Sequence, residues 1–215
     1  MTLEPPILDP ISLVGLQPLF IGRHRKCFPF PDDESRCIKV VRRMSLREAD
    51  KLSNYLRHRF LYPFSFFDIN RRDYKAYQAV RDQLQRYLPL YSGMVRTDVG
   101  YGLAEELVRN YDGRIAQTAE SFLSSRGQIA GTPLWAEFLN FFDLLRRHEI
   151  FLFDLNLQNF LVREKSKGHF VPIIIDLKRL GESREFLQLA AWSRAHAMDK
   201  LERRIRRVSN RILQP

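Results

Sequence analysis

The first half of the chain alternates short apolar runs with clusters of Pro, Gly and Asp, a pattern typical of antiparallel strands joined by tight turns. The pattern predicts strands over residues 19–21, 25–30, 37–41, 94–97 and 103–108. The first twenty residues are rich in proline, and we expect them to form an irregular lead-in.

Apolar residues also recur at spacings of three and four along several segments, which is the period of an amphipathic helix. This spacing predicts helices over residues 45–60, 68–88, 133–147 and 185–213. Thr132 and Pro133 supply an N-cap and a first position for the third of these helices. A hairpin of two strands, over 160–162 and 170–175, lies between the last two helices.

The order of these elements indicates an α+β fold. We expect a small antiparallel β-rich N-terminal lobe over residues 1–108, which also holds the first two helices. A reduced helical C-terminal lobe with the hairpin follows over residues 109–215.

The composition is that of a folded protein. With 45% hydrophobic and 12% aromatic residues, the 215-residue chain can bury a core, which excludes a disordered protein. It has no basic start typical of a secretory signal and no apolar run of the ~20 residues that span a membrane. Cys27 and Cys37 are too few for a disulfide scaffold. We expect a cytoplasmic protein with two reduced, inert thiols, and the sequence leaves open whether they can pair.

The net charge of +10 favours anionic partners such as nucleotides, nucleic acid or an anionic membrane surface. Half of this excess lies in residues 194–215, which carry seven basic and two acidic side chains. We favour a solvated helix face over peripheral contact with anionic lipid. A nucleic-acid interface is disfavoured because the stretch has no aromatic residues.

Three polar residues frame the predicted hairpin. Asp154 ends an apolar run, Asn159 precedes the first strand, and Asp176 ends the second. If the hairpin pairs in this register, two carboxylates and an amide oxygen meet at one end, a donor set that suits Mg²⁺. Phosphoryl transfer needs that ion and a carboxylate that orients the attacking hydroxyl. The same residue types are also common hairpin-end caps.

Lys39 and Asp73 each place a charge where an apolar residue is expected, one inside a strand and one on the inner stripe of a helix. A buried charge needs a partner, so we expect the two to pair if strand and helix pack together. The alternatives are an edge lysine that reaches solvent and a surface aspartate. Gly22, before a basic stretch, is a turn that can lie over phosphates.

In this order the glycine turn, strand lysine, helix acid, D-x4-N and strand-end Asp resemble the protein-kinase-like fold. Longer stretches, including GRHRKCFPFPDDESRCIKVV, RTDVGYGL, YDGR, LQNFLV and RLGES, are similar to the YrbL family of PhoP-regulatory-network proteins. IIIDLKR also resembles the D-L-x-R of bacterial lipopolysaccharide core kinases.

The resemblance implies a role for each of these residues in binding ATP and Mg²⁺. Lys39 contacts the α- and β-phosphates with Asp73 as its helix partner, and Asp154 is the catalytic base. Asn159 and Asp176 hold magnesium. The hinge that receives adenine is implied to run from Glu105 through Leu107 to Val108, and Gly22 is what remains of the glycine-rich loop.

The chain departs from the kinase pattern at several positions. Leu152 and Phe153 stand where kinases place His-Arg, and Leu177 and Lys178 replace the Phe-Gly of the metal-binding motif. Because 39 residues follow Asp176, a protein substrate is disfavoured. We therefore expect a phosphotransferase that acts on a small-molecule or saccharide hydroxyl, with a pseudokinase that serves as a regulatory binding module as the alternative.

Overall fold

The computed structural model describes residues 6–42, 69–127, 129–177, 180 and 193–213. The chain divides into two compact units. The first comprises Met1–Gln78 and Leu90–Leu107, and the second comprises Ala79–Pro89 and Val108–Pro215. The helix predicted over residues 45–60 lies outside the described residues.

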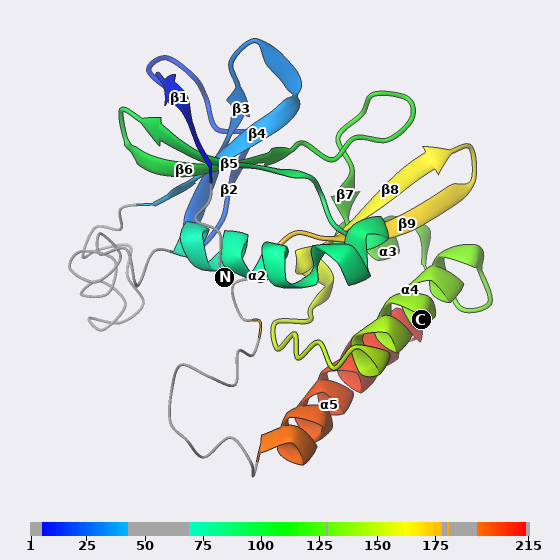
Figure 1. Ribbon diagram of the computed structural model, residues 1–215. Helices are drawn as coiled ribbons and strands as arrows, with labels where there is room; N and C mark the ends of the chain where they lie inside the picture. The colour runs from blue at the N-terminus through cyan, green and yellow to red at the C-terminus, as the bar shows by residue number, and fades with distance from the viewer. Residues whose placement is uncertain (1–5, 43–68, 128, 178–179, 181–192, 214–215) are drawn as a thin grey trace. The chain divides into compact units, whose positions relative to one another are not determined.

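A six-stranded sheet in the order β1-β5-β6-β4-β3-β2 forms the first unit (Figure 1). Its strands are β1 (Ile7–Ile11), β2 (Phe20–Ile21), β3 (Arg25–Phe30), β4 (Asp33–Val41), β5 (Tyr91–Thr97) and β6 (Gly100–Glu106). Each of the five predicted strands is present, although β4 begins at Asp33, four residues before the start predicted for that strand.

The prediction of an irregular lead-in is wrong for residues 7–11. β1 pairs in parallel with β5, so the sheet is not purely antiparallel. Pro10 is tolerated because β1 lies at the edge of the sheet, where a missing N–H breaks no ladder. The backbone of Pro6 approaches Gly93 so closely that a Cβ atom on residue 93 would lie 2.6 Å from the backbone oxygen of Pro6.

The two faces of the sheet pack against different cores because successive side chains of a strand alternate. Ile38 and Val40 of β4 join a buried cluster completed by Leu13, Phe28, Val95 and Ala104. Cys37 and Lys39 therefore point to the opposite face. On that face Leu103 packs with a second cluster, which contains Tyr74, Tyr91 and Met94.

Helix α2 (Ile69–Leu84) and the 3-10 turn η2 (Gln85–Tyr87) match the helix predicted over 68–88. Its N-terminal part, up to Gln78, belongs to the first unit. The ring of Tyr77 stacks on that of Tyr91 with centroids 4.2 Å apart, so aromatic contacts fix this part of α2 against β5.

The second unit combines a three-stranded antiparallel sheet with helices. Its elements are β7 (Gln117–Thr118), α3 (Ala119–Arg126), α4 (Pro133–Arg147), η3 (Leu157–Asn159), β8 (Phe160–Ser166), β9 (His169–Ile174) and α5 (Ser193–Leu213). The predicted hairpin is confirmed, and α4 has the predicted bounds, with the Thr132 hydroxyl accepting a hydrogen bond from the Trp135 N–H. The short elements β7 and α3 were not predicted, because α3 buries only Ala119 and Phe122 and shows no helical stripe.

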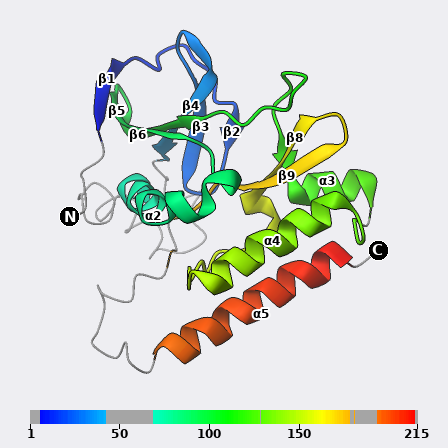
Figure 2. The ribbon, with the colours of Figure 1, turned by 45° about the vertical axis from the view of Figure 1, so that its right-hand side comes forward.

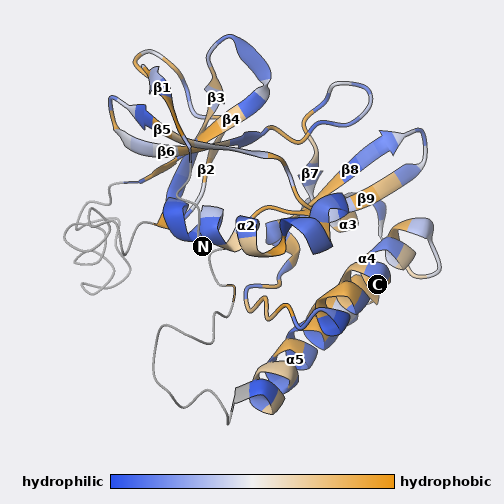
Figure 3. Cartoon of the chain, viewed as in Figure 1, coloured by the Kyte–Doolittle hydropathy of each residue, from blue (hydrophilic) through white to orange (hydrophobic). Residues whose placement is uncertain are grey.

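Helix α5 packs beside α4, as Figures 1 and 2 both show. Its apolar stripe is buried, and Arg146 of α4 forms an ion pair with Glu202 at 2.6 Å. Figure 3 shows hydrophobic and hydrophilic positions alternating along both helices. Arg203, Arg206 and Arg207 of α5 are exposed. The part of α5 predicted before residue 193 lies outside the described residues, and none of the helices in the described part could cross a membrane.

Candidate functional site

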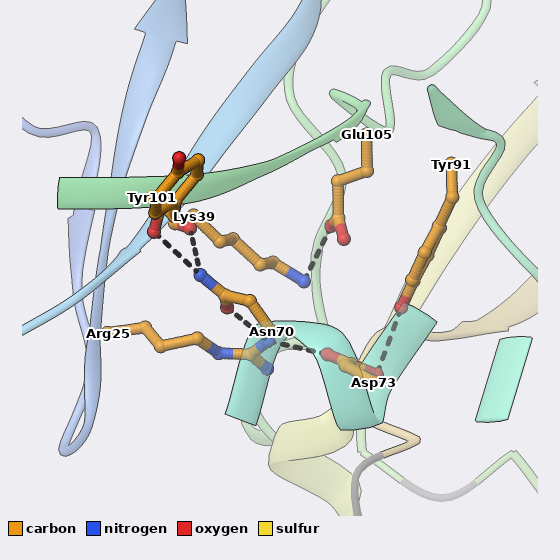
Figure 4. A network of polar contacts seen from close by, with 7 residues as sticks. All are labelled: Arg25, Lys39, Asn70, Asp73, Tyr91, Tyr101 and Glu105. Atoms are coloured by element: carbon orange, nitrogen blue, oxygen red, sulfur yellow. Dashed lines mark hydrogen bonds and ion pairs between the residues drawn. The ribbon is translucent and has the colours of Figure 1, made fainter. Parts of the chain in front are cut away.

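Lys39 lies at the centre of a buried polar network in the first unit (Figure 4). Its ammonium nitrogen is 2.5 Å from Oε1 of Glu105 on β6, and both residues are buried. Burial lowers the pKa of Lys39, but the attraction of Glu105 and Asp73 outweighs it and leaves that pKa raised. Lys39 therefore carries its charge inside the protein.

Glu105 supplies the negative charge next to Lys39, and half of its carboxylate is unused. Burial raises the pKa of Glu105, and the nearby lysine only partly offsets this effect. Within the described part of the chain, Oε2 of Glu105 is buried and has no hydrogen-bond partner. Because an unsatisfied buried acceptor is costly, this oxygen is a position where a bound ligand with an N–H or O–H donor would be stabilised.

Asp73 lies fully buried on α2 in the same network. Its Oδ2 forms a 2.5 Å ion pair with Nη1 of Arg25 on β3, and the Tyr91 hydroxyl donates to its Oδ1 at 3.2 Å. Asp73, which was predicted to pair with Lys39, attracts it electrostatically. However, the direct ion pair with Lys39 at 2.5 Å comes from Glu105.

Asn70 ties α2 to the sheet one turn before Asp73. Its side-chain amide donates to the backbone oxygen of Lys39 at 2.8 Å and to that of Tyr101 at 3.4 Å (Figure 4). Asn70, Arg25 and Tyr91 were not predicted as site residues from the sequence. For Arg25 the sequence offered one signal. Side chains alternate along β3, so Arg25 lies on the same face of the strand as Cys27.

Gly22 and the predicted hinge have mainly backbone roles in the structure. The Gly22 N–H donates to the Arg25 oxygen at 2.8 Å and closes the turn between β2 and β3. The Leu107 N–H donates to the Ser35 oxygen, and the Val108 oxygen accepts from the Ala116 N–H. The Leu107 N–H and the Val108 oxygen are therefore engaged within the protein.

In the second unit, hydrogen bonds connect the segments that carry Asp154, Asn159 and Asp176. The Asn159 side-chain amide donates to the Asp154 backbone oxygen at 2.9 Å. The Asn159 backbone oxygen accepts from the Ile175 N–H at 2.9 Å, next to the buried Asp176. Phe160 pairs with Ile174, so the hairpin has the register that brings these residues to one end.

Asn156, which was not predicted, is the cap of this loop. Its Oδ1 accepts from the N–H groups of Gln158 and Asn159 at 3.0 and 3.1 Å, and its amide donates to Oδ1 of Asp154 at 3.3 Å. Asn159 uses its own Nδ2 as a donor, so Oδ1 is the atom with which it would bind a cation.

The donor set of this loop fits magnesium. Two carboxylates and one amide oxygen are hard oxygen ligands, and Mg²⁺ takes its remaining ligands from water and phosphate. Among the described residues there is no group of three or more His, Cys, Asp or Glu side chains arranged to hold a metal. A cation here would therefore depend on the amide of Asn159 and on ligand oxygens.

Comparison with known proteins identifies the family of this chain. A family model described as PhoP regulatory network protein YrbL matches residues 11–213. The YrbL proteins of Escherichia coli (strain K12) and Shigella flexneri are each 29% identical over 199 residues, covering 90% of this chain and 83% of the relative.

Among solved structures, the Rio2 kinase of Chaetomium thermophilum, in an ADP/Mg²⁺-phosphoaspartate complex, matches with a TM-score of 0.51 and 16% identity. The match covers 96% of this chain but 56% of that chain, so this protein spans little more than half the length of Rio2 kinase. The likeness shows a protein-kinase-like fold, as the order of motifs predicted.

Proposed function

Because this chain belongs to the PhoP regulatory network protein YrbL family and has a protein-kinase-like fold, we propose that it is an ATP- and Mg²⁺-dependent phosphotransferase acting on a small-molecule or saccharide hydroxyl. The observation that carries this proposal is the buried Lys39 on β4, which is paired with Glu105 and attracted by Asp73. Burying an ammonium group costs free energy of desolvation even when the group is paired. A role in phosphate binding would explain a lysine at this buried position.

Each of the predicted residues would have one role in nucleotide binding. Lys39 would bind the α- and β-phosphates, with the Gly22 turn near them and adenine at the segment from Glu105 to Val108. In the second unit, Asn159 and Asp176 would hold Mg²⁺, which when bound neutralises charge on the phosphates. The similar Rio2 kinase was solved as a complex with ADP and Mg²⁺, which supports this choice of ligands.

Asp154 would act as the base for the acceptor hydroxyl. Its carboxylate is held at Oδ1 by the Asn156 amide, and its half-buried position keeps it accessible. It would orient the hydroxyl and take its proton as the phosphoryl group is transferred. The resemblance of Asp176-Leu177-Lys178-Arg179 to the D-L-x-R of lipopolysaccharide core kinases supports a saccharide acceptor.

A second candidate function is a pseudokinase that binds a nucleotide or a partner without turnover. The observation that favours it is the burial of Leu152 and Leu177, which are both 0% exposed at positions where kinases carry His and Phe. Both side chains serve the core, and Leu152, unlike the His at that position in kinases, offers no polar atom to the reaction.

Nucleotide binding is the first test. We expect ATP with Mg²⁺ to raise the melting temperature of the wild type and to lose this effect in Lys39→Ala and Asp176→Ala. Lys75→Ala is the matched control, because Lys75 is an exposed lysine on α2. Equal shifts in all four proteins would contradict the assigned site.

Phosphoryl transfer is the second test and separates the two candidates. The protein is incubated with γ-labelled ATP and purified lipopolysaccharide core oligosaccharide. Label that the wild type transfers to the oligosaccharide and Asp154→Asn does not transfer supports the phosphotransferase. Binding of ATP without transfer or hydrolysis supports the pseudokinase.

A further inference from the structure

Both cysteines of the protein lie on the same sheet face as Lys39 and Glu105. Cys27 on β3 is directly opposite Lys39 on β4, and Cys37 is directly opposite Glu105 on β6. Cys37 and Lys39 are two residues apart on one strand, so their side chains share a face. Cys27 and Cys37 are therefore diagonal neighbours on adjacent strands.

The two thiols contact each other and differ in chemistry. They are joined by a side-chain hydrogen bond, which lowers the pKa of Cys27, and Lys39 lowers it further against the opposing effect of burial. The same hydrogen bond, with burial and the charge of Glu105, raises the pKa of Cys37. Cys27 is also the more exposed of the two. A partly exposed thiol with a lowered pKa next to a lysine is the kind that reacts with oxidants.

We propose that Cys27 and Cys37 form a peroxide-sensitive dithiol that closes to a disulfide between β3 and β4. The Cys27 thiolate attacks one oxygen of hydrogen peroxide, which gives Cys27 sulfenic acid and hydroxide, and the hydroxide becomes water on protonation. The Cys37 sulfur then attacks the Cys27 sulfur and displaces a second hydroxide, which leaves as water with the Cys37 proton. Overall, two thiols lose two electrons and two protons, and peroxide is reduced to two waters.

The position of the pair makes the disulfide reversible and places it beside the polar network. Diagonal neighbours are farther apart than directly opposed residues, so the bond would form under strain and be reduced easily. It would remove the Cys27 thiolate from beside Lys39 and restrain β3, which also carries Arg25, against β4. The reaction uses neither ATP nor magnesium, so its test is independent of the proposed transferase activity.

Mass spectrometry of the full chain tests the proposal. The reduced protein is treated with hydrogen peroxide, quenched, unfolded and alkylated with iodoacetamide. We expect the wild type to lose the mass of two hydrogens, to take up no alkyl group and to yield a peptide pair linked through Cys27 and Cys37. Dithiothreitol should restore two alkylatable thiols. Two alkylatable thiols after peroxide, or only disulfides between chains, would overturn the proposal.

Single variants separate the roles of the two cysteines. In Cys37→Ala the reaction should stop at Cys27 sulfenic acid, which dimedone traps, whereas the wild type should accumulate several-fold less adduct. In Cys27→Ala, Cys37 should stay reduced at the same peroxide dose. Equal dimedone labelling in wild type and Cys37→Ala would show that Cys37 does not resolve the sulfenic acid. If either variant fails to fold by circular dichroism, the linked peptide of the wild type still decides.

Discussion

Lys39 on β4 forms its 2.5 Å ion pair with Glu105, although the strand register places Glu105 opposite Cys37 and not opposite Lys39. The lysine thus reaches diagonally across the sheet to a carboxylate on the neighbouring strand. The sheet itself supplies the countercharge at 2.5 Å, and α2 contributes Asp73 as a second anion that attracts Lys39. Phosphates that bind Lys39 would have to share it with Glu105.

The energetic coupling of Lys39 and Glu105 is the first prediction. Removing one partner leaves a buried charge uncompensated, so Glu105→Gln and Lys39→Met should each lower the free energy of unfolding by about 3 kcal/mol. The double variant Lys39→Met/Glu105→Gln should lose much less free energy of unfolding than the sum of the two single losses, because no charge is left unpaired. Urea denaturation measures the free energy of unfolding of the three variants.

The control for this cycle is an exposed pair on α5. Arg203 contacts Asp199 at 2.7 Å with both side chains more than half exposed. Arg203→Ala should therefore change the unfolding free energy by at most about 0.5 kcal/mol. Additive losses in the Lys39/Glu105 cycle would contradict the structural pairing.

Asp73 is expected to be as sensitive as Glu105. The Arg25 side chain is only 11% exposed, so Asp73→Asn leaves a nearly buried guanidinium without its anion and should cost about 3 kcal/mol. Tyr91→Phe removes one hydrogen bond to the same carboxylate and should cost about 1 kcal/mol. Denaturant titration of both variants gives the ranking, and a larger loss in Tyr91→Phe would show that the ion pair is not the main contact.

The polar network around Lys39 could be predicted only in part from the sequence. A lysine inside an apolar strand must have a countercharge, and an aspartate on the inner stripe of a helix must be buried, so both residues were identified as candidates. Their partners depend on strand register and on the reach of side chains, which local periodicity does not encode. For this reason the ion pair with Glu105 and the contacts of Asp73 with Arg25 and Tyr91 required the three-dimensional structure.

The hairpin residues of the second unit were easier to predict, because their contacts are local. Asp154 and Asn159 are five residues apart, and the two strands that follow fix the position of the segment before Asp176. By contrast, β1 was missed because proline is a loop signal that an edge strand tolerates. The burial of Leu152 and Leu177 follows from packing, so sequence showed only that they depart from the kinase pattern.

Asn159 should affect both loop stability and magnesium. Asn159→Ala removes the donor to the Asp154 oxygen, at a cost of about 1 kcal/mol, and also removes the oxygen proposed to bind Mg²⁺. Asn159→Asp loses the donor but keeps an oxygen. We expect Asn159→Ala to lose the Mg²⁺-dependent part of the ATP-induced melting shift and Asn159→Asp to retain it. Gln158→Ala, at the exposed neighbouring position, should behave like the wild type, and a retained shift in Asn159→Ala would exclude Asn159 as a ligand.

Tyr87 gives a pH-dependent prediction within the second unit. Its hydroxyl donates to Glu137 at 3.0 Å, and burial together with this carboxylate raises the pKa of Tyr87 from 10.0 to about 12. Because the folded state favours the neutral phenol, this contribution to stability is fully present below pH 10 and is lost as the pH rises through about 12. Ultraviolet titration should therefore show a tyrosine ionisation step near pH 12 that is missing in Tyr87→Phe. The exposed Tyr111 provides the control, since Tyr111→Phe should leave the ionisation step in place. A step that persists in Tyr87→Phe would refute its assignment to Tyr87.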